Sequence, residues 1–181
     1  MASLQNIETL LQQRLQKALG ELPLVVGNEA VNWVKQNFRR QGYPDRSLTP
    51  WKPRKANSRR NAGRGILIGT GRLSRSTRII STARLQVNIG TDVPYAKAHN
   101  EGVDKVVTVK SHSRKKTGNI RISSGRTGEF KTKKGIVGST IVKAHQRSMH
   151  LPKRQFIGNS QILQNILTRK AIVHVGRQLK K

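Results

Sequence analysis

The side chains that could carry acid–base or metal chemistry are few in this sequence, and they are dispersed. Only eight residues are acidic, whereas a nuclease-like magnesium site needs several carboxylates brought together. The one local group is Asp92, Glu101 and Asp104, which lie within thirteen residues of one another. Their spacing matches no metal-binding loop, so we interpret them as solvated residues or as ion-pair partners of Arg and Lys.

Histidine, cysteine and glycine patterns argue against the other common kinds of site. The five histidines are scattered, and no two have the i, i+4 spacing that places two metal ligands on one helix face. The absence of cysteine excludes disulfides, thiolate metal sites and thiol catalysis. The pairs Gly63/Gly65 and Gly69/Gly71 lack the Gly-Lys-Ser/Thr ending of a phosphate-binding loop, and we interpret them as turns. We predict a protein that is not an enzyme and that holds neither a metal nor a cofactor.

Positive charge is the dominant property of the chain. Thirty-six Lys and Arg against eight Asp and Glu give a formal net charge of +28 over 181 residues. Self-repulsion at this density disfavours a compact free monomer unless a polyanion, an acidic protein surface or counterions offset it. DNA is the favoured polyanion, bound through phosphates without sequence readout, and a basic surface facing acidic sister proteins is the alternative.

The hydropathy of the chain predicts a modest core and no membrane association. Hydrophobic residues make up 34% of the sequence, so a partner subunit is expected to bury part of the surface. No run of 18 apolar residues occurs, and the N-terminus lacks the basic and apolar regions of a signal peptide. We expect synthesis in a cytoplasm.

The elements that must position any site are predicted from periodicity in the first hundred residues. Apolar spacing predicts two helices that pack on the core, over 3–20 and 24–40, separated by Gly20 and Pro23. A basic loop follows to Gly65, with Trp51 either pinned at the core edge or exposed as a contact anchor.

Strands and a helical turn are predicted next. Strands are expected over 65–69, 73–80 and 83–89, the last two as a hairpin that turns near Ser81 and Thr82. A short helical turn then starts at Pro94 and closes at Gly102.

The stretch at about 104–150 differs in composition from the rest. Strands around Val106–Val109 and Ile136–Val142 flank an interval rich in Gly, Ser and Lys that has little to bury. A C-terminal helix is expected from Ser160. The prediction is therefore an α+β fold with N-terminal helices, a small antiparallel β-sheet, a long basic β-hairpin or loop arm, and a C-terminal helix. We treat 1–181 as a single domain into which the arm is inserted.

The basic loop and the arm are the expected contact surfaces for DNA or a partner protein. The residues concerned are Arg54, Lys55, Arg59, Arg60, Arg64, Arg114, Lys115, Lys116, Arg121, Arg126, Lys131, Lys133 and Lys134.

Several short motifs occur in a recognisable order along residues 28 to 175. Gly42 and Trp51 precede the basic loop, Thr70–Leu73 opens the strands, and Val87–Thr91 ends one. Tyr-Ala-x-x-His-x-x-Gly follows at 95–102, and Pro-x-Arg-x-Phe-x-Gly stands at 152–158. This order resembles the phage virion morphogenesis family, the tail-completion proteins of Mu-like and P2-like tailed phages.

The resemblance implies an α+β fold and a structural role in finishing the tail so that a filled head can join it. By similarity to other connector proteins, it also implies a homo-oligomeric ring, with a hexamer as one arrangement, in contact with neighbouring tail or neck proteins. The expected location is the tail or neck region of a virion assembled in a bacterial host. The motif residues given structural roles are Trp51, Gly71, Leu73, Tyr95, His99, Gly102, Pro152, Arg154 and Phe156.

Physical roles follow for five of these residues. Tyr95 and His99 are four apart, so we expect them to share one face and to pack on the sheet, with their polar tips bonded to backbone. Gly102 is expected to end that turn in the left-handed αL conformation. Arg154 is expected to pair with a carboxylate of a neighbouring subunit, and Phe156 to fill the core beneath the last helix.

Two other functions compete with a virion connector that also contacts the DNA end. One is a free basic nucleic-acid-binding protein, associated with ribosomes or the nucleoid, although no helix-turn-helix or aromatic RNA-binding strand is recognisable. The other is a basic nuclease, which the missing carboxylates disfavour. A gene position among head and tail genes would favour the connector.

Overall fold

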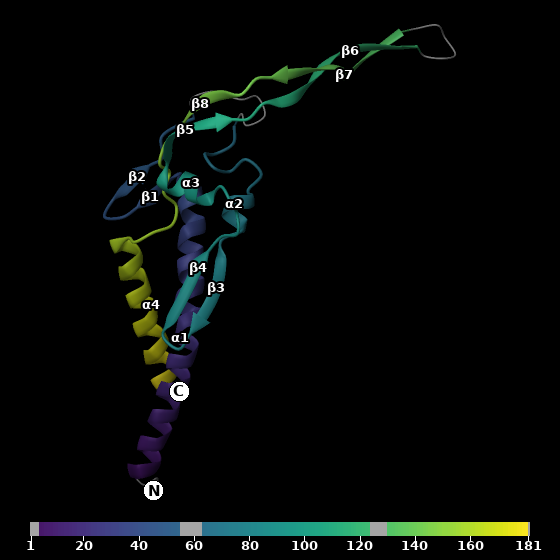
Figure 1. Cartoon of the computed structure of the whole chain (residues 1–181). Helices are drawn as coiled ribbons and strands as arrows, with labels where there is room; N and C mark the ends of the chain where they lie inside the picture. The colour runs from purple at the N-terminus through teal and green to yellow at the C-terminus, as the bar shows by residue number, and fades with distance from the viewer. Residues whose placement is uncertain (1–3, 55–62, 124–129, 181) are drawn as a thin grey trace. The chain divides into compact units, whose positions relative to one another are not determined.

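The structure is a computed structural model that describes residues 4–54, 63–123 and 130–180. The chain divides into two compact units. We call Met1–Val103 together with Leu151–Lys181 the body, and Asp104–His150 the arm (Figure 1). Within the described residues, no helix is both long and apolar enough to cross a bilayer.

One long helix organises the body. Helix α1 runs unbroken over Leu4–Arg40, and the predicted break at Gly20 and Pro23 is wrong. Proline removes one hydrogen bond of the helix ladder and usually kinks or ends a helix. Here Pro23 is buried inside α1, and tertiary contacts lie on both sides of it. Glu21 accepts a hydrogen bond from Gln178, and Glu29 pairs with Lys170, so packing outweighs the local cost.

The C-terminal helix α4, Gln161–Leu179, packs along α1 (Figure 1). It begins as predicted, because the Ser160 side chain accepts a hydrogen bond from the backbone N–H of Leu163 at 3.1 Å. The Ser160 hydroxyl also donates to the Pro44 carbonyl at 2.7 Å, which fixes the start of α4 to the end of β1.

The body carries two small antiparallel hairpins. Strand β1, Gly42–Pro44, pairs with β2, Leu48–Pro50. Strand β3, Arg78–Ala83, pairs with β4, Gln86–Gly90, which confirms the predicted hairpin. Its turn is at Arg84 and Leu85, and the predicted turn near Ser81 and Thr82 is wrong, because both residues belong to β3. This hairpin lies against α1 at Gly27, where an added Cβ would come within 2.7 Å of Val87 and 2.9 Å of Ile79. Glycine therefore permits the close approach.

Two further predictions are wrong in the segment between the hairpins. Residues 65–69 form turns rather than a strand, and Leu67 has a left-handed φ of 61°. The predicted strand from Leu73 begins as a short helix, α2, Arg72–Arg75, after Gly71 at φ 74°. Apolar runs this short do not distinguish a strand from a packed loop. Helix α3, Ala96–Glu101, matches the predicted turn.

The core of the body joins α1 to segments that are distant in sequence. Phe38 of α1 packs against Trp51 and Phe156, with ring centroids 5.6 and 5.2 Å apart. Trp33 meets Tyr43 edge-on at 5.4 Å. Asn37, fully buried, donates to the Phe156 carbonyl at 3.1 Å. The segment that follows the arm is thus part of the same core as the N-terminal helix.

The described part of the arm consists of paired strands and short connections. Its long ladder pairs β6, His112–Ser123, with β7, Phe130–Val142, in antiparallel register. Strands β5, Val103–Val109, and β8, His145–Leu151, pair with each other at its base. The sequence predicted either a long basic hairpin or a loop for this part of the chain, and the structure has the hairpin.

Candidate partner-binding site

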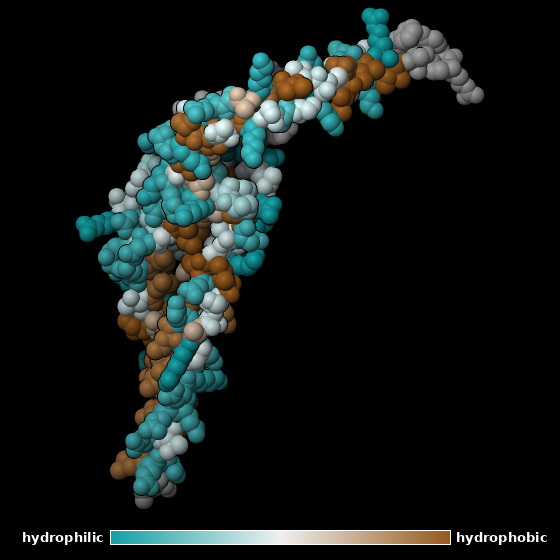
Figure 2. Space-filling view, in the orientation of Figure 1, coloured by the Kyte–Doolittle hydropathy of each residue, from teal (hydrophilic) through white to brown (hydrophobic). Residues whose placement is uncertain are grey.

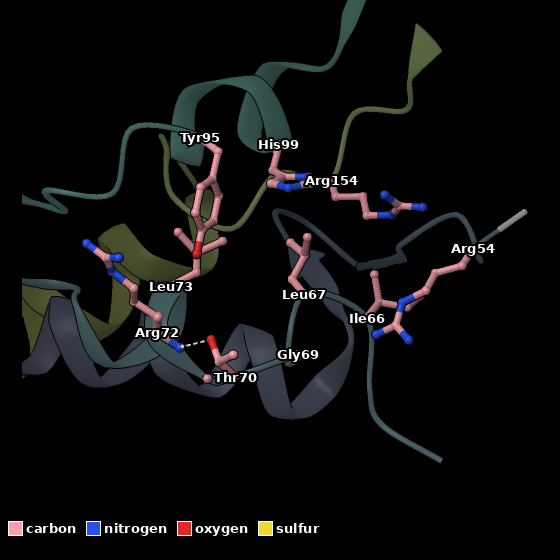
Figure 3. Close-up of a pocket in the computed structure, with 11 residues that line it drawn as sticks. Arg54, Ile66, Leu67, Gly69, Thr70, Arg72, Leu73, Tyr95, His99 and Arg154 are labelled. Carbon is pink, nitrogen blue, oxygen red and sulfur yellow. Dashed lines mark hydrogen bonds between the residues drawn. The ribbon is translucent and has the colours of Figure 1, made fainter. Parts of the chain in front are cut away.

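A pocket of about 380 Å³ lies in the body beside the core (Figure 3). The residues that line it come from four segments that surround the α3 turn. They are Arg54, Ile66, Leu67, Gly69, Thr70, Gly71, Arg72, Leu73, Tyr95, His99 and Arg154. Five of the nine motif residues are thereby brought together, namely Gly71, Leu73, Tyr95, His99 and Arg154.

Arg154 holds one wall of this pocket in place. Its side chain is nearly buried, with Nε donating to the Lys52 carbonyl at 2.9 Å and Nη2 donating to the Pro53 carbonyl at 3.1 Å. Burial, followed by the charge of Arg54, lowers the pKa of Arg154. Two guanidinium groups are therefore close enough to repel each other, which an incoming anion would relieve.

His99 and Tyr95 line the pocket beside Arg154 (Figure 3). Their rings meet at 86° with centroids 5.8 Å apart, so the two residues share a face as predicted. Tyr95 is 43% exposed, and the two residues line the pocket instead of packing on a sheet. The prediction that backbone groups bond both polar tips is wrong for His99, because its buried Nδ1 has no hydrogen-bond partner among the described residues.

The charge state of His99 follows from its surroundings. Burial, followed by the positive charge of Arg154, lowers the pKa of His99 below its ordinary value of 6.5. The neutral imidazole is therefore the main form at pH 7, and His99 adds no positive charge to the pocket at that pH.

Two glycines give the pocket its backbone shape. Gly71 has φ 74° and precedes α2, and Gly102 has φ 81° with ψ 166° after α3. The latter angles lie outside the αL region that was predicted, although they also favour glycine. A Cβ on Gly102 would stand 2.9 Å from the Lys153 nitrogen, so this position is also a close approach of two chain segments.

The other motif residues support the pocket from outside it. Trp51 is buried and its indole N–H donates to the Gln155 carbonyl at 2.7 Å. Phe156 is 1% exposed in the core, and Pro152 is half-buried. Trp51 is thus pinned in the core, which was the first of the two interpretations left open.

Sequence reasoning missed Asn100, which connects α3 to the segment after the arm. Its side-chain oxygen accepts from the backbone N–H of Phe156 at 3.0 Å and of Ile157 at 3.1 Å. Its place inside the motif of Tyr95 to Gly102 was the available signal. The apolar floor of Ile66 and Leu67 was also missed, because those residues were assigned to a strand.

The lining of this pocket is basic and aliphatic. The side chains of Arg54, Arg72 and Arg154 line the pocket together with the aliphatic Ile66 and Leu67, which suits an anionic group next to an apolar one. None of the described lining residues is acidic, and no group of three or more metal-ligating side chains occurs among the described residues. Among the described lining residues, no hydrogen bond joins a nucleophilic side chain to a base.

The predicted basic contact residues fall in both units. In the body, Arg54 lines the pocket and Arg64 donates to the Gly69 carbonyl at 2.6 Å. In the arm, the exposed ones are Arg114, Lys115, Lys116, Arg121, Lys133 and Lys134. Lys131 pairs with Ile122 through the backbone, and the structure does not describe the side chain of Lys131. Lys55, Arg59, Arg60 and Arg126 lie outside the described residues.

The register of β6 and β7 distributes cations over both faces of the ladder. Residues directly opposite in an antiparallel pair share a face, and successive residues alternate. Arg114 and Lys116 therefore lie on one face together with Lys133, the partner of Ile120. Lys115 and Arg121 lie on the other face together with Lys134, the partner of Asn119. No arm residue whose side chain is described is buried.

Comparison with known proteins gives one result. The model of the phage virion morphogenesis family matches residues 2–171. No curated protein and no solved structure matches the chain significantly.

Proposed function

We propose that this chain, which belongs to the phage virion morphogenesis family and is therefore a virion-associated assembly protein of a bacteriophage, is a non-enzymatic tail-completion protein. It acts at the head-proximal end of the tail, as a tail completion or neck connector, and readies the tail for joining to a filled head. Copies of the chain form a ring there, with neighbouring tail or neck proteins on either side.

The observation that carries this proposal is the arm. Its 47 residues contain twelve Lys and Arg and two acidic residues, a formal charge of +10, and the ladder presents cations on both faces. A hairpin with one buried face would carry apolar residues on that face instead. A strand ladder that is charged on both faces suits a space between partners, where phosphates or carboxylates meet it from two sides.

The pocket supplies a second, protein-facing contact. A volume of about 380 Å³ with an aliphatic floor accommodates a side chain or a chain end, whereas a DNA duplex is far too wide to enter. We assign it to an acidic residue with an apolar neighbour on an adjacent tail or neck protein. The intrachain bonds of Arg154 hold its Nε and Nη2, so we assign the remaining Arg154 nitrogen to such a carboxylate.

The defining experiment is complementation of a phage that lacks this gene. We expect electron microscopy of the mutant lysate to show filled heads and complete-length tails that are not joined. Supplying the wild-type protein should restore joined particles. Normally joined virions without the protein would contradict a role in tail completion and would favour a free nucleic-acid-binding protein.

DNA contact by the arm is tested on the purified protein. The variant Arg114→Gln/Lys115→Gln/Lys116→Gln removes three exposed cations of β6. Each lost phosphate contact reduces the magnitude of the slope of log affinity against log salt by about 0.9. The slope of the triple variant should therefore be smaller in magnitude by up to about 2.7. The matched control Lys17→Gln/Arg39→Gln/Arg46→Gln removes three exposed cations of the body and should retain the slope. Equal slopes in both variants would reject the arm as the DNA contact.

A further inference from the structure

The first turns of α1 present large apolar side chains to solvent. Leu4 is 86% exposed, Ile7 46%, Leu11 45% and Leu15 40%, although their helical spacing predicted a core-facing helix. We call these four residues the apolar stripe. Their spacings of three, four and four residues place them on one face of the helix.

The stripe is the uncovered continuation of a helix–helix interface. Helix α4 has 19 residues and α1 has 37, so α1 extends past the end of its partner. Leu179, the last residue of α4, lines a groove of about 550 Å³ together with the four stripe residues. In Figure 1, the N-terminal turns of α1 lie beyond the C-terminus of α4, and Figure 2 shows hydrophobic residues at the surface there.

A helical segment of this kind is expected to have a partner. Isolated helices shorter than about 12–15 residues are marginal in water, and most helical stability comes from packing of the apolar face. Every residue from Leu4 to Gln13 is exposed, so burial within the described chain stabilises the first turns only weakly.

The charge of the segment identifies the kind of partner. Residues 1–16 contain one acid, Glu8, and one base, Arg14, so their net charge is zero, and the remaining residues carry the whole +28. An acidic partner would find no excess of cations here. A membrane-surface helix carries Lys and Arg along its polar face, whereas this one carries mainly Gln. The stripe is the part of this basic chain where two copies can meet without repulsion.

We propose that the apolar stripe binds the apolar stripe of a second copy of this chain, with the two α1 helices antiparallel. Antiparallel pairing places the two basic bodies at opposite ends of the contact, whereas parallel pairing would bring like charges side by side. The contact is then self-complementary, because the same residues are used on both copies. A two-fold contact pairs two copies and is therefore separate from the head-to-tail contacts that would close the proposed ring, so this inference does not depend on the role proposed in the tail.

The test is the mass of the purified full-length protein by sedimentation equilibrium. We expect the wild type to reach at least twice the chain mass of 20.3 kDa. For the variant Leu11→Glu/Leu15→Glu, the dissociation constant of self-association should be at least about 100-fold larger than for the wild type, because the variant places charges in the contact. The control Leu24→Glu/Ile172→Glu, at residues 56% and 67% exposed, should associate like the wild type. Helical circular dichroism at 222 nm checks that each variant is folded.

Two results would overturn the proposal. One is a wild type that stays monomeric at its solubility limit, and the other is a stripe variant that associates as tightly as the control. The direction of pairing is tested with single cysteines, since the chain has none of its own. A mixture of Gln5→Cys and Gln16→Cys proteins should give heterodimers with a short bis-maleimide, whereas efficient linking of Gln5→Cys to itself would refute the antiparallel arrangement.

Discussion

The substitution Arg154→Met tests whether this guanidinium is an internal clamp. In the structure, Arg154 bridges the carbonyls of Lys52 and Pro53, and its own N–H donates to the His99 carbonyl at 2.8 Å. Methionine matches the aliphatic stem of arginine but lacks the guanidinium and has no donor, so the side-chain bonds are lost while the backbone bond remains. The segment after Trp51 should then be held only through the core.

The expected loss of stability follows from those two bonds. Hydrogen bonds to a charged group contribute roughly 1.5–3 kcal/mol each, and the relief of repulsion with Arg54 offsets part of the loss. We therefore expect a decrease of about 2–4 kcal/mol in the free energy of unfolding. With a urea m-value of about 2 kcal/mol/M, the unfolding midpoint should fall by roughly 1–2 M.

Urea denaturation followed by the fluorescence of Trp33 and Trp51 provides the measurement. The control is Arg147→Met, at an exposed position of the arm, which removes the same charge from a chain of net +28. A midpoint for Arg154→Met that equals that of the control would refute the clamp, and Arg154 would then be available to the carboxylate of a neighbouring subunit.

Three further predictions concern the body. Phe156→Ala should lower its unfolding free energy by about 3–5 kcal/mol, measured by thermal denaturation, because it leaves a cavity next to Phe38; a loss below about 1 kcal/mol would contradict the core position. Ser160→Ala should cost about 1–3 kcal/mol by the same assay, since it removes the α4 cap and the bond to Pro44, and an unchanged midpoint would show that neither bond matters. Because the pKa of His99 is lower in the folded than in the unfolded chain, His99 of the unfolded chain is protonated first as the pH falls. The free energy of unfolding should therefore decrease as the pH drops from 6.5 towards the pKa of His99 in the folded protein. His99→Gln should remove that part of the pH dependence, and an identical profile for the two proteins would refute it.

The sequence predicted the elements whose signals are local. Ser160 caps α4 where expected, β3 and β4 form the predicted hairpin, and the fold class is α+β with a long N-terminal helix, small antiparallel sheets and a C-terminal helix. Pro23 misled the prediction because its local cost is offset by contacts with α4 and β4, which no local pattern reveals. The apolar spacing of Leu4 to Leu15 correctly gave a helix but wrongly gave a buried face, since periodicity does not say what covers a face.

The pocket could be predicted only in part. Tyr95 and His99 share a helical turn, so their proximity follows from spacing, whereas Arg154 reaches them from 55 residues further along the chain. Motif order suggested that these residues belong together, but it did not indicate that they surround a cavity. The turn conformation of 65–69 depends on Leu67 in a left-handed region, which is rare for that residue type and is stabilised by packing on the core.

The close approach at Gly102 has a consequence for how this protein can change over time. Where the arm leaves and re-enters the body, a Cβ on Gly102 would lie only 3.1 Å from the Leu151 carbonyl oxygen, so the two ends of the insertion are neighbours. A stretch whose ends are adjacent can be lengthened, shortened or exchanged for another without altering the path of the residues before and after it. The 47 residues of the arm can therefore be exchanged as a unit, and one recombination event can give the same body a different set of contacts.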